Sequence, residues 1–238
     1  MTTSIKKAII LAGGKGTRLR SAVPNLPKPM APINNVPFLE YLISYWIGQG
    51  IKEFFLSVGY KKDIIISHFG REYKGSQISY VLEDEALGTG GAFILSSKNI
   101  KETFLLLNGD TFVEIDLQKL ANHHKKNNSI WTIAVVKKDD IKRYLGIKTS
   151  DSGEILELAS KSAKGENFVN AGAYLINGEI RTLFRDMIGK ACSLENDLLP
   201  LIHSSDCRVY SFEVNGKFID IGLPEDYYRA QDLFKRLI

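Results

Sequence analysis

The chain has 238 residues, of which 44% are hydrophobic and 24% charged, and its formal net charge is +4. This composition is typical of a folded globular protein and excludes a disordered or collagen-like chain. The basic residues form no long run, which argues against nucleic-acid binding, and no apolar stretch approaches the ~18 residues of a membrane-spanning helix. We therefore expect a cytoplasmic protein that has neither a nucleic acid nor a membrane as partner. Cys192 and Cys207 lack metal-site spacing and are expected to be reduced thiols.

The first half of the chain alternates strand and helix patterns. Residues 6–12 form a continuous apolar run bounded by glycines, as in a strand that is buried on both faces. Apolar residues then recur at helical spacing over residues 37–50. Further strand patterns begin at Glu53, Ile78 and Thr103, and helical segments between them end at Gly70 and Ser97. This alternation predicts a doubly wound α/β fold with a mostly parallel sheet.

The second half is richer in strand patterns. Asp116 opens a polar helix, where His123 and His124 stand beside two lysines and are expected on a solvated face. A hairpin is predicted over residues 144–161, a short helix after Ser193, and a closing helix over residues 224–237. The other strand patterns of this half begin at Ile130, Phe168 and Cys207. No linker or repeat interrupts the chain, so we expect one domain over residues 1–238 with a mixed sheet and a β-rich insertion.

Glycines follow the first predicted strand in the run Gly13-Gly14-Lys15-Gly16-Thr17-Arg18-Leu19. At this place in an open α/β sheet, such a loop can bring backbone N–H groups against phosphate oxygens. The run matches neither the dinucleotide fingerprint, because Leu19 replaces the third glycine, nor the Walker loop. A simple tight turn is the alternative interpretation. Arg18 inside the loop and Lys28 between two prolines favour the phosphate site.

Three further motifs lie where a phosphate site would need them. Asp110 ends an apolar strand at the carboxyl edge of the sheet, either as an Mg²⁺ ligand or as a plain turn residue. Asp220 follows the last predicted strand and could supply a second carboxylate to the metal. The run Gly88-Thr89-Gly90-Gly91 precedes a helix, where the backbone can approach a ligand closely or merely turn. Together the motifs favour a phosphate-binding site with Asp110 and Asp220 as candidate Mg²⁺ ligands.

In their order along the chain, these motifs resemble the sugar-1-phosphate nucleotidyltransferases over about residues 6–237. The resemblance implies a Rossmann-like (GT-A-like) fold and the transfer of a nucleotidyl group from a nucleoside triphosphate to a sugar 1-phosphate. Residues 28–33, 107–111 and 218–222 most resemble the branch that uses GTP and D-glycero-α-D-manno-heptose 1-phosphate to make nucleotide sugars for cell-surface glycans. The motifs that carry the resemblance are Leu11-Ala12-Gly13-Gly14-Lys15-Gly16-Thr17-Arg18-Leu19, Pro27-Lys28-Pro29, Leu87-Gly88-Thr89-Gly90-Gly91, Gly109-Asp110, Asn170-Ala171-Gly172 and Asp220-Ile221-Gly222-Leu223-Pro224.

The resemblance also implies a role for each matching residue. The catalytic residues would be Arg18 on the β- and γ-phosphates, Lys28 on the α-phosphate, Lys161 on the sugar phosphate, and Asp110, which would bind Mg²⁺ together with Asp220. Residues 1–115 would form the nucleotide-binding half and residues 140–222 the sugar-phosphate-binding half. The nucleotide-binding residues would be Leu11, Ala12, Gly13, Gly14, Gly16, Thr17, Glu83, Gly88 and Thr89. The sugar-phosphate-binding residues would be Thr111, Gly146, Lys161, Asn170 and Gly172.

Other residues of the sequence bear on which base and which sugar the protein uses. Glu83 stands where the family reads the base, and a carboxylate, which only accepts hydrogen bonds, suits the N1–H and amino group of guanine. A solvated charge at a strand end is the alternative. The chain departs from the family at Ser160, where a glutamate commonly precedes the lysine, so Glu157 is a candidate replacement. It departs again where Leu145 separates Tyr144 from Gly146.

Other functions remain as alternatives. They are uridylyl or other nucleotidyl transfer to a different sugar 1-phosphate, a non-catalytic sugar-nucleotide-binding regulator, and a metal-dependent glycosyltransferase. The joint presence of the basic and acidic motif residues argues against a regulator, and a lysine-bearing loop suited to a triphosphate argues against a glycosyltransferase. Because the expected core occupies the whole chain, we expect no appended β-helix domain. The oligomeric state is left open between monomer and dimer.

Overall fold

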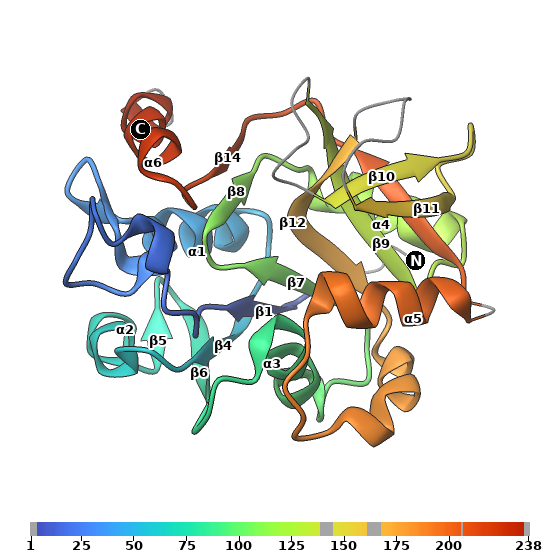
Figure 1. Ribbon diagram of the computed structural model, residues 1–238, viewed down its shortest axis with the longest axis horizontal. Coiled ribbons are helices and arrows are strands. Elements are labelled where there is room, and N and C mark those ends of the chain that lie inside the picture. The colour runs from blue at the N-terminus through green and yellow to red at the C-terminus, as the bar shows by residue number, and fades with distance from the viewer. Residues whose placement is uncertain (1–3, 139–144, 161–167, 206, 236–238) are drawn as a thin grey trace.

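The computed structural model describes residues 4–138, 145–160, 168–205 and 207–235 (Figure 1). The strands are β1 (Lys7–Leu11), β2 (Pro32–Ile33), β3 (Val36–Pro37), β4 (Glu53–Val58), β5 (Glu72–Tyr73), β6 (Ser76–Leu82), β7 (Phe104–Asn108), β8 (Thr111–Val113), β9 (Trp131–Lys137), β10 (Leu145–Thr149), β11 (Ile155–Ser160), β12 (Phe168–Ile176), β13 (Val209–Glu213) and β14 (Phe218–Asp220). The α-helices are α1 (Phe38–Gly48), α2 (Lys62–Phe69), α3 (Gly88–Ser97), α4 (Leu117–Lys126), α5 (Leu199–Ser204) and α6 (Pro224–Lys235). Short helical turns of other types are η1 (Thr17–Leu19), η2 (Lys28–Met30), η3 (Gly178–Met187) and the π-helical η4 (Leu194–Leu198).

A large central sheet organises the molecule, in the order β11-β10-β12-β7-β1-β4-β6-β5, with β9 and β13 continuing from β12. Its N-terminal part is mostly parallel, since β1 pairs in parallel with both β7 and β4, and β4 with β6, whereas the edge strand β5 pairs antiparallel with β6. Its C-terminal part is antiparallel around β12, which pairs with β7, β9 and β10. The expected α/β fold with a β-rich second half is therefore confirmed, including the hairpin of β10 and β11.

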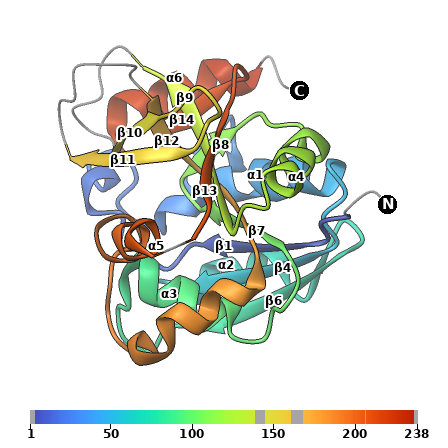
Figure 2. The same ribbon diagram turned by 90° about the vertical axis from the view of Figure 1, so that its right-hand side faces the viewer.

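Both faces of the sheet are covered, as the continuous apolar sequence of β1 predicts. Ala8 and Ile10 belong to one buried cluster and Ile9 to the other, and all three are fully buried. Helices α1, α2, α4 and α6 supply side chains to the first cluster, whereas α3, η3 and α5 supply the second. Figures 1 and 2 show α1 and α3 on opposite sides of β1. Among the described residues, no helix is both long and apolar enough to cross a membrane.

The direction of winding reverses next to β1. The chain passes from β1 through α1 to β4 and through α2 to β6, then returns through α3 to β7 on the other side of β1. A ligand in such a sheet binds outside the carboxyl ends of the two strands at the reversal. Leu11 pairs with Asn108 at those ends, so the loops that begin at Ala12 and Gly109 lie side by side. The fold thus brings the two sequence motifs to one place.

The expectation of a solvated histidine pair on α4 is wrong for His124. Asp116 caps α4 as expected, but the helix packs its histidine side against the sheet, which leaves His124 only 6% exposed. Its Nδ1 lies 2.8 Å from the hydroxyl of the buried Thr132 on β9. His123 is half-buried against the ring of Phe212. Burial, and then the neighbouring His123, lower the pKa of His124 to about 4.

This buried imidazole is expected to make stability depend on pH. Below pH 6.5 the unfolded chain protonates His124 while the folded protein keeps it neutral, so the unfolded state binds more protons. The free energy of unfolding should therefore fall by about 2–3 kcal/mol through this residue between pH 6.5 and 4. Urea unfolding across this range should show a shallower fall for His124→Gln, and an unaltered fall for a control at the exposed His203→Gln. An equally steep fall in His124→Gln would contradict the assignment.

Candidate active site

A cleft of about 1060 Å³ lies at the carboxyl ends of β1 and β7, at the reversal of the sheet. This volume is at the upper end of those that hold small ligands, for which roughly 300–1000 Å³ is common. It is lined by segments from both halves of the chain. The residues that the sequence singles out and that line it are Leu11, Ala12, Gly13, Gly14, Gly16, Thr17, Arg18, Lys28, Glu83, Gly88, Thr89, Asp110, Thr111, Asn170 and Asp220.

The glycine loop follows β1 and forms one wall of the cleft. Gly16 has a positive φ of 56°, and a Cβ there would lie only 2.7 Å from Cβ of Lys28, so glycine allows the loop to close on this lysine. At Gly14, by contrast, a Cβ would meet no atom within 4 Å. Packing therefore does not require glycine at position 14, and its bare backbone faces open space that a ligand can occupy. Arg18 follows on η1 with an exposed side chain.

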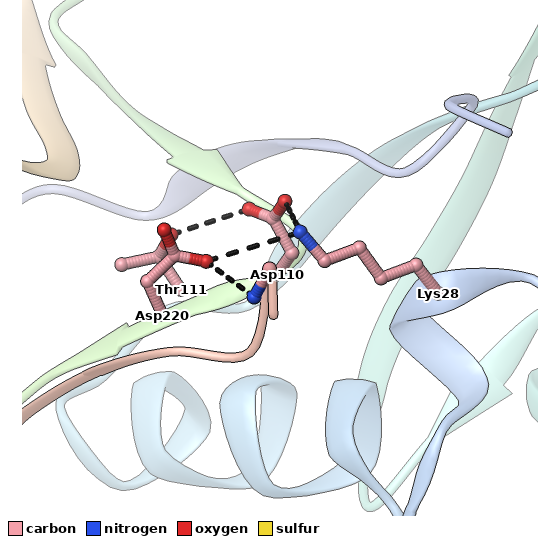
Figure 3. A network of polar contacts seen from close by, with 5 residues as sticks. Lys28, Asp110, Thr111 and Asp220 are labelled. Atoms are coloured by element: carbon pink, nitrogen blue, oxygen red, sulfur yellow. Dashed lines mark hydrogen bonds and ion pairs between the residues drawn. The ribbon is translucent and has the colours of Figure 1, made fainter. Parts of the chain in front are cut away.

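Lys28 lies at the centre of a charge cluster with two aspartates (Figure 3). Its side chain is 9% exposed, and Nζ lies 2.5 Å from Oδ2 of Asp110 and 3.8 Å from Oδ1 of Asp220. The Thr111 hydroxyl donates to the other Asp110 oxygen at 3.2 Å, and the Gly222 N–H donates to Oδ1 of Asp220 at 2.7 Å. Both carboxylates are thereby aimed at the same point in the cleft.

Asp220 reaches this point through a short strand that sequence periodicity does not reveal. The last predicted strand, β13, ends at Glu213, and Asp220 ends a separate strand, β14. This strand pairs antiparallel with β8, which sets Asp220 opposite Thr111, the residue after Asp110. The Ile221 N–H also donates to the Asp110 carbonyl oxygen at 3.0 Å. The pairing of β8 with β14 is thus what joins the two aspartates.

The two aspartates differ electrostatically. Burial alone would raise the pKa of Asp110, but the Lys28 ammonium and the hydrogen bonds from Lys28 and Thr111 outweigh it and hold that pKa below its usual value. Burial and the negative charge of Asp110 raise the pKa of Asp220, and Lys28 compensates only in part. Burial and the Asp110 charge likewise raise the pKa of Glu195, another residue of the cleft wall. One buried lysine therefore faces two carboxylates, whose negative charges also act on the carboxylate of Glu195.

Glu83 lies at the opposite end of the cleft wall, directly after β6. Its Oε1 accepts a hydrogen bond of 3.0 Å from the Ser57 hydroxyl on β4, and the carboxylate lies against Gly13. A Cβ at Gly13 would collide with that carboxylate. Glu83 is half-buried and held by the protein, which does not fit a freely solvated charge at a strand end.

The first turn of α3 uses its glycines for packing against another part of the chain. A Cβ at Gly88 would lie 2.5 Å from the Cys192 carbonyl oxygen, and one at Gly90 would lie 2.8 Å from the Cys192 sulfur. The Gly90 N–H donates to the same carbonyl oxygen at 2.9 Å. Thr89 accepts a hydrogen bond of 2.9 Å from the Leu194 N–H through its hydroxyl. Gly88 and Thr89 line the cleft, and the close approach that the glycines permit is to residues 190–194.

The expected sugar-phosphate residues are only partly brought together. Asn170 and Thr111 line the cleft, whereas Gly146 is buried within β10 and Gly172 lies behind Asn108 and Thr111. Gly172 supports Asn170 through a backbone N–H that donates to the Asn170 side-chain oxygen at 3.0 Å. Lys161 and Tyr144 lie outside the described residues. Glu157 is exposed on β11.

Sequence reasoning missed Glu195. It follows Leu194 in η4, lines the cleft, and accepts a hydrogen bond of 3.1 Å from the Asn170 amide at Oε1. An acidic residue two positions after a capping serine is usual in any first helical turn, where it interacts with the helix dipole. The one signal in the sequence is that Glu195 follows Ser193, the residue predicted to begin a helix.

The donor set of the cleft suits a magnesium ion. Mg²⁺ prefers oxygen ligands and usually takes one or two carboxylates, keeping waters and phosphate oxygens for its other positions. Asp110 and Asp220 are two convergent carboxylates beside a cleft able to hold phosphates. Among the described residues, no group of three or more histidines, cysteines or acids is placed to hold a metal. Two carboxylates without a complete protein cage fit a metal that is bound together with a nucleotide.

This architecture is that of an enzyme that binds a nucleotide where its α/β sheet reverses direction. A family comparison narrows the class. Residues 7–236 match the model for nucleotidyl transferases, and the chain belongs to this family. The resemblance inferred from the motifs is therefore confirmed, and so is the fold class.

Individual relatives are similar to this chain over nearly their whole length. The chain is 41% identical over 223 residues to the D-glycero-alpha-D-manno-heptose 1-phosphate guanylyltransferase of Campylobacter jejuni, covering 93% of this chain and 97% of that protein. It is 39% identical over 227 residues to the protein of the same name from Aneurinibacillus thermoaerophilus, covering 94% and 96%. The crystal structure of HddC from Yersinia pseudotuberculosis has a TM-score of 0.83 and 34% identity, covering 97% of this chain and 100% of that one. The same protein complexed with GMP-PN has a TM-score of 0.82, with the same identity and coverage.

Proposed function

We propose that this chain transfers a guanylyl group from GTP to D-glycero-α-D-manno-heptose 1-phosphate and releases pyrophosphate. The observation that carries the proposal is the Lys28, Asp110 and Asp220 cluster beside the glycine loop, in a cleft large enough for two substrates. The names of the two guanylyltransferase relatives support the choice of base and sugar. We assign nucleotide binding to residues 1–115 and sugar-phosphate binding to residues 140–222.

The proposed reaction is an in-line displacement at the α-phosphorus of GTP. An oxygen of the sugar phosphate attacks, the bond to the bridging oxygen breaks, and pyrophosphate leaves. A phosphate monoester with a second pKa of ~6 is mostly dianionic at neutral pH, so the nucleophile needs no general base. The protein then has to position two anions and neutralise charge, which agrees with a cleft centred on a lysine.

Each basic residue has its own task in this proposal. The buried Lys28 ammonium neutralises the α-phosphate as charge builds up on it, and Arg18, exposed on η1, holds the β- and γ-phosphates. The open backbone at Gly14 lets the triphosphate approach closely. Lys161, outside the described residues, is proposed to grip the sugar phosphate. We further propose that Asp110 and Asp220 hold Mg²⁺, which when bound supplies Lewis-acid stabilisation of the phosphate oxygens.

Glu83 is proposed to select guanine. Ser57 holds one of its oxygens, so the carboxylate is a fixed acceptor for the N1–H and amino group of the base. Uracil and thymine offer one N–H between two carbonyl oxygens, and those carbonyls would be repelled by a carboxylate. Glu83 would therefore explain both the preference for guanine and the rejection of uracil and thymine.

Product formation from a matrix of nucleotides and sugar 1-phosphates tests the proposal. With GTP, UTP, CTP, dTTP and ATP as donors, we expect GDP-heptose as the main product by mass. Glu83→Gln should reduce the preference for GTP at least about tenfold, because the amide presents a donor to one of the guanine donors. Glu85→Gln, at an exposed residue of the same cleft wall, should leave the preference unchanged. A wild-type preference for UTP, or equal changes in both variants, would contradict the assignment.

A further inference from the structure

The cleft has two ends, and the order of the strands sets their separation. Glu83 directly follows β6, whereas Asn170 lies in β12, and the strands between them are β7, β1 and β4. Four steps between neighbouring strands, at roughly 4.8 Å each, separate the two ends by about 19 Å. The Lys28 cluster lies between them, after β7. If the base lies at Glu83 and the phosphates at Lys28, the sugar is directed toward Asn170.

Glu195 is the carboxylate at this far end. Its Oε1 is fixed by the 3.1 Å hydrogen bond from the Asn170 amide, whose nitrogen also lies 2.6 Å from the Tyr174 hydroxyl. The side-chain oxygen of Asn170 is occupied by the Gly172 N–H, so the amide cannot turn over freely. Among the described residues, Oε2 of Glu195 has no hydrogen-bond partner. The residue thus presents an acceptor in a fixed place on the cleft wall.

The backbone around Glu195 is built to hold it there. The π-helical turn η4 is capped by Ser193, whose hydroxyl accepts from the Asn196 N–H at 3.1 Å, and it is anchored by the buried Leu194 and Leu198. The first residue of η4 is hydrogen-bonded to the first turn of α3, because the Leu194 N–H donates to the Thr89 hydroxyl. Turns of this π type are frequent at functional sites.

The chemistry of the position restricts its ligand. A carboxylate beside two aspartates repels phosphate and accepts hydrogen bonds only, so its ligand must be an uncharged group with donors. A cation held jointly with the aspartates is not indicated, because the described residues contain no cluster of three such side chains suited to a metal. Neighbouring hydroxyl groups of a sugar are uncharged and donate hydrogen bonds, so they meet both conditions.

We propose that Glu195, held by Asn170, binds hydroxyl groups of the acceptor sugar. It would thereby perform the role of the family glutamate, in whose position this chain has Ser160. The assignment rests on the proposed transfer to a sugar 1-phosphate. It makes Glu195 a specificity-determining residue for the sugar. Glu157, exposed on β11, is then not needed for this role.

Binding of GDP and GDP-mannose, measured by calorimetry, tests the assignment without requiring turnover. The wild type should bind GDP-mannose more tightly than GDP, and Glu195→Gln should weaken GDP-mannose binding about tenfold while changing GDP binding less than twofold. In steady-state assays, the KM for the sugar 1-phosphate should rise to a similar extent, with the KM for GTP unchanged. Asp197→Asn is the matched control, because Asp197 lies in the same turn and caps the Ser193 N–H outside the cleft.

Acceptors that lack single hydroxyl groups make the test more specific. At the hydroxyl that Glu195 binds, the losses from the missing hydroxyl and from Glu195→Gln should not add. Additive losses at every hydroxyl, equal weakening of GDP and GDP-mannose, or no wild-type preference for GDP-mannose over GDP would overturn the assignment. Selective loss of GDP-mannose binding in a protein that forms no GDP-heptose would refute the proposed reaction and uphold Glu195.

Discussion

Lys28→Ala is expected to lower kcat for nucleotidyl transfer about a thousandfold, the scale seen when a preorganised charge on a reacting phosphoryl group is removed. Lys28 is 9% exposed and lies 2.5 Å from Asp110, so its charge acts in a cleft from which much of the water is excluded. Such a charge needs no reorganisation during the reaction. The KM for GTP should rise much less, because in the proposed mechanism Arg18 and the loop backbone still hold the triphosphate.

The same substitution should reduce stability. Without Lys28, Asp110 and Asp220 face each other and Glu195 with no buried cation. We expect the free energy of unfolding in metal-free buffer to fall by about 2 kcal/mol, less than for a fully buried pair because both aspartates are about one-third exposed. Millimolar Mg²⁺ should recover part of this loss.

Lys15→Ala is the matched control, since Lys15 is an exposed lysine on the wall of the same cleft. It should retain most of the wild-type kcat and stability. Steady-state kinetics and urea unfolding of both variants, with and without Mg²⁺, provide the measurements. A Lys28→Ala enzyme within tenfold of the wild-type kcat, or equal effects of the two substitutions, would show that the lysine has no special role.

The predictable part of the fold is the part with strong periodicity. The apolar run of β1, the helical spacing of α1 and the capped start of α4 each indicate an element, and the parallel sheet follows from their alternation. Glycines and charged residues at the ends of β1 and β7 then lie together because carboxyl ends of parallel strands share one edge. The approach of the glycine loop to Asp110 is predictable for this reason.

Other parts of the site depend on contacts without a local signal. Strands β8 and β14 have three residues each, too few for a pattern, so the sequence does not show that Asp220 lies opposite Thr111. The glycines at 88 and 90 have an obvious composition, but their partner, Cys192, lies about a hundred residues away. The prediction that His124 is solvated is wrong because a polar helix can still bury one polar side chain that has a hydrogen-bond partner in the sheet.

Asp110→Asn is expected to remove activity almost as completely as Lys28→Ala, lowering kcat by a factor of about 10²–10³. The amide keeps the size of the side chain and can still contact Thr111, but it carries no charge. It should therefore orient Lys28 less well and weaken the proposed binding of Mg²⁺. Raising the Mg²⁺ concentration should recover part of the rate.

Stability separates this substitution from Lys28→Ala. Removing the Asp110 charge costs the ion pair with Lys28, but it also relieves the repulsion of Asp220 and Glu195, whose pKa values the same charge raises. Asp220 remains 3.8 Å from Lys28 as a partner. We expect the free energy of unfolding to change by less than about 1 kcal/mol, because these contributions oppose each other.

The comparison needs a control with the same chemistry. Asp84→Asn changes an exposed aspartate of the same cleft wall and should leave both kcat and stability close to the wild-type values. Because this cluster and the neighbouring Glu195 together hold one lysine and three acids, loss of the positive charge should destabilise the site and loss of one negative charge should not. A loss of stability in Asp110→Asn as large as in Lys28→Ala would mean that the aspartate serves the fold as a structural ion pair. A large loss of kcat with unchanged stability would instead place its function in the bound state, where the nucleotide supplies the missing ligands.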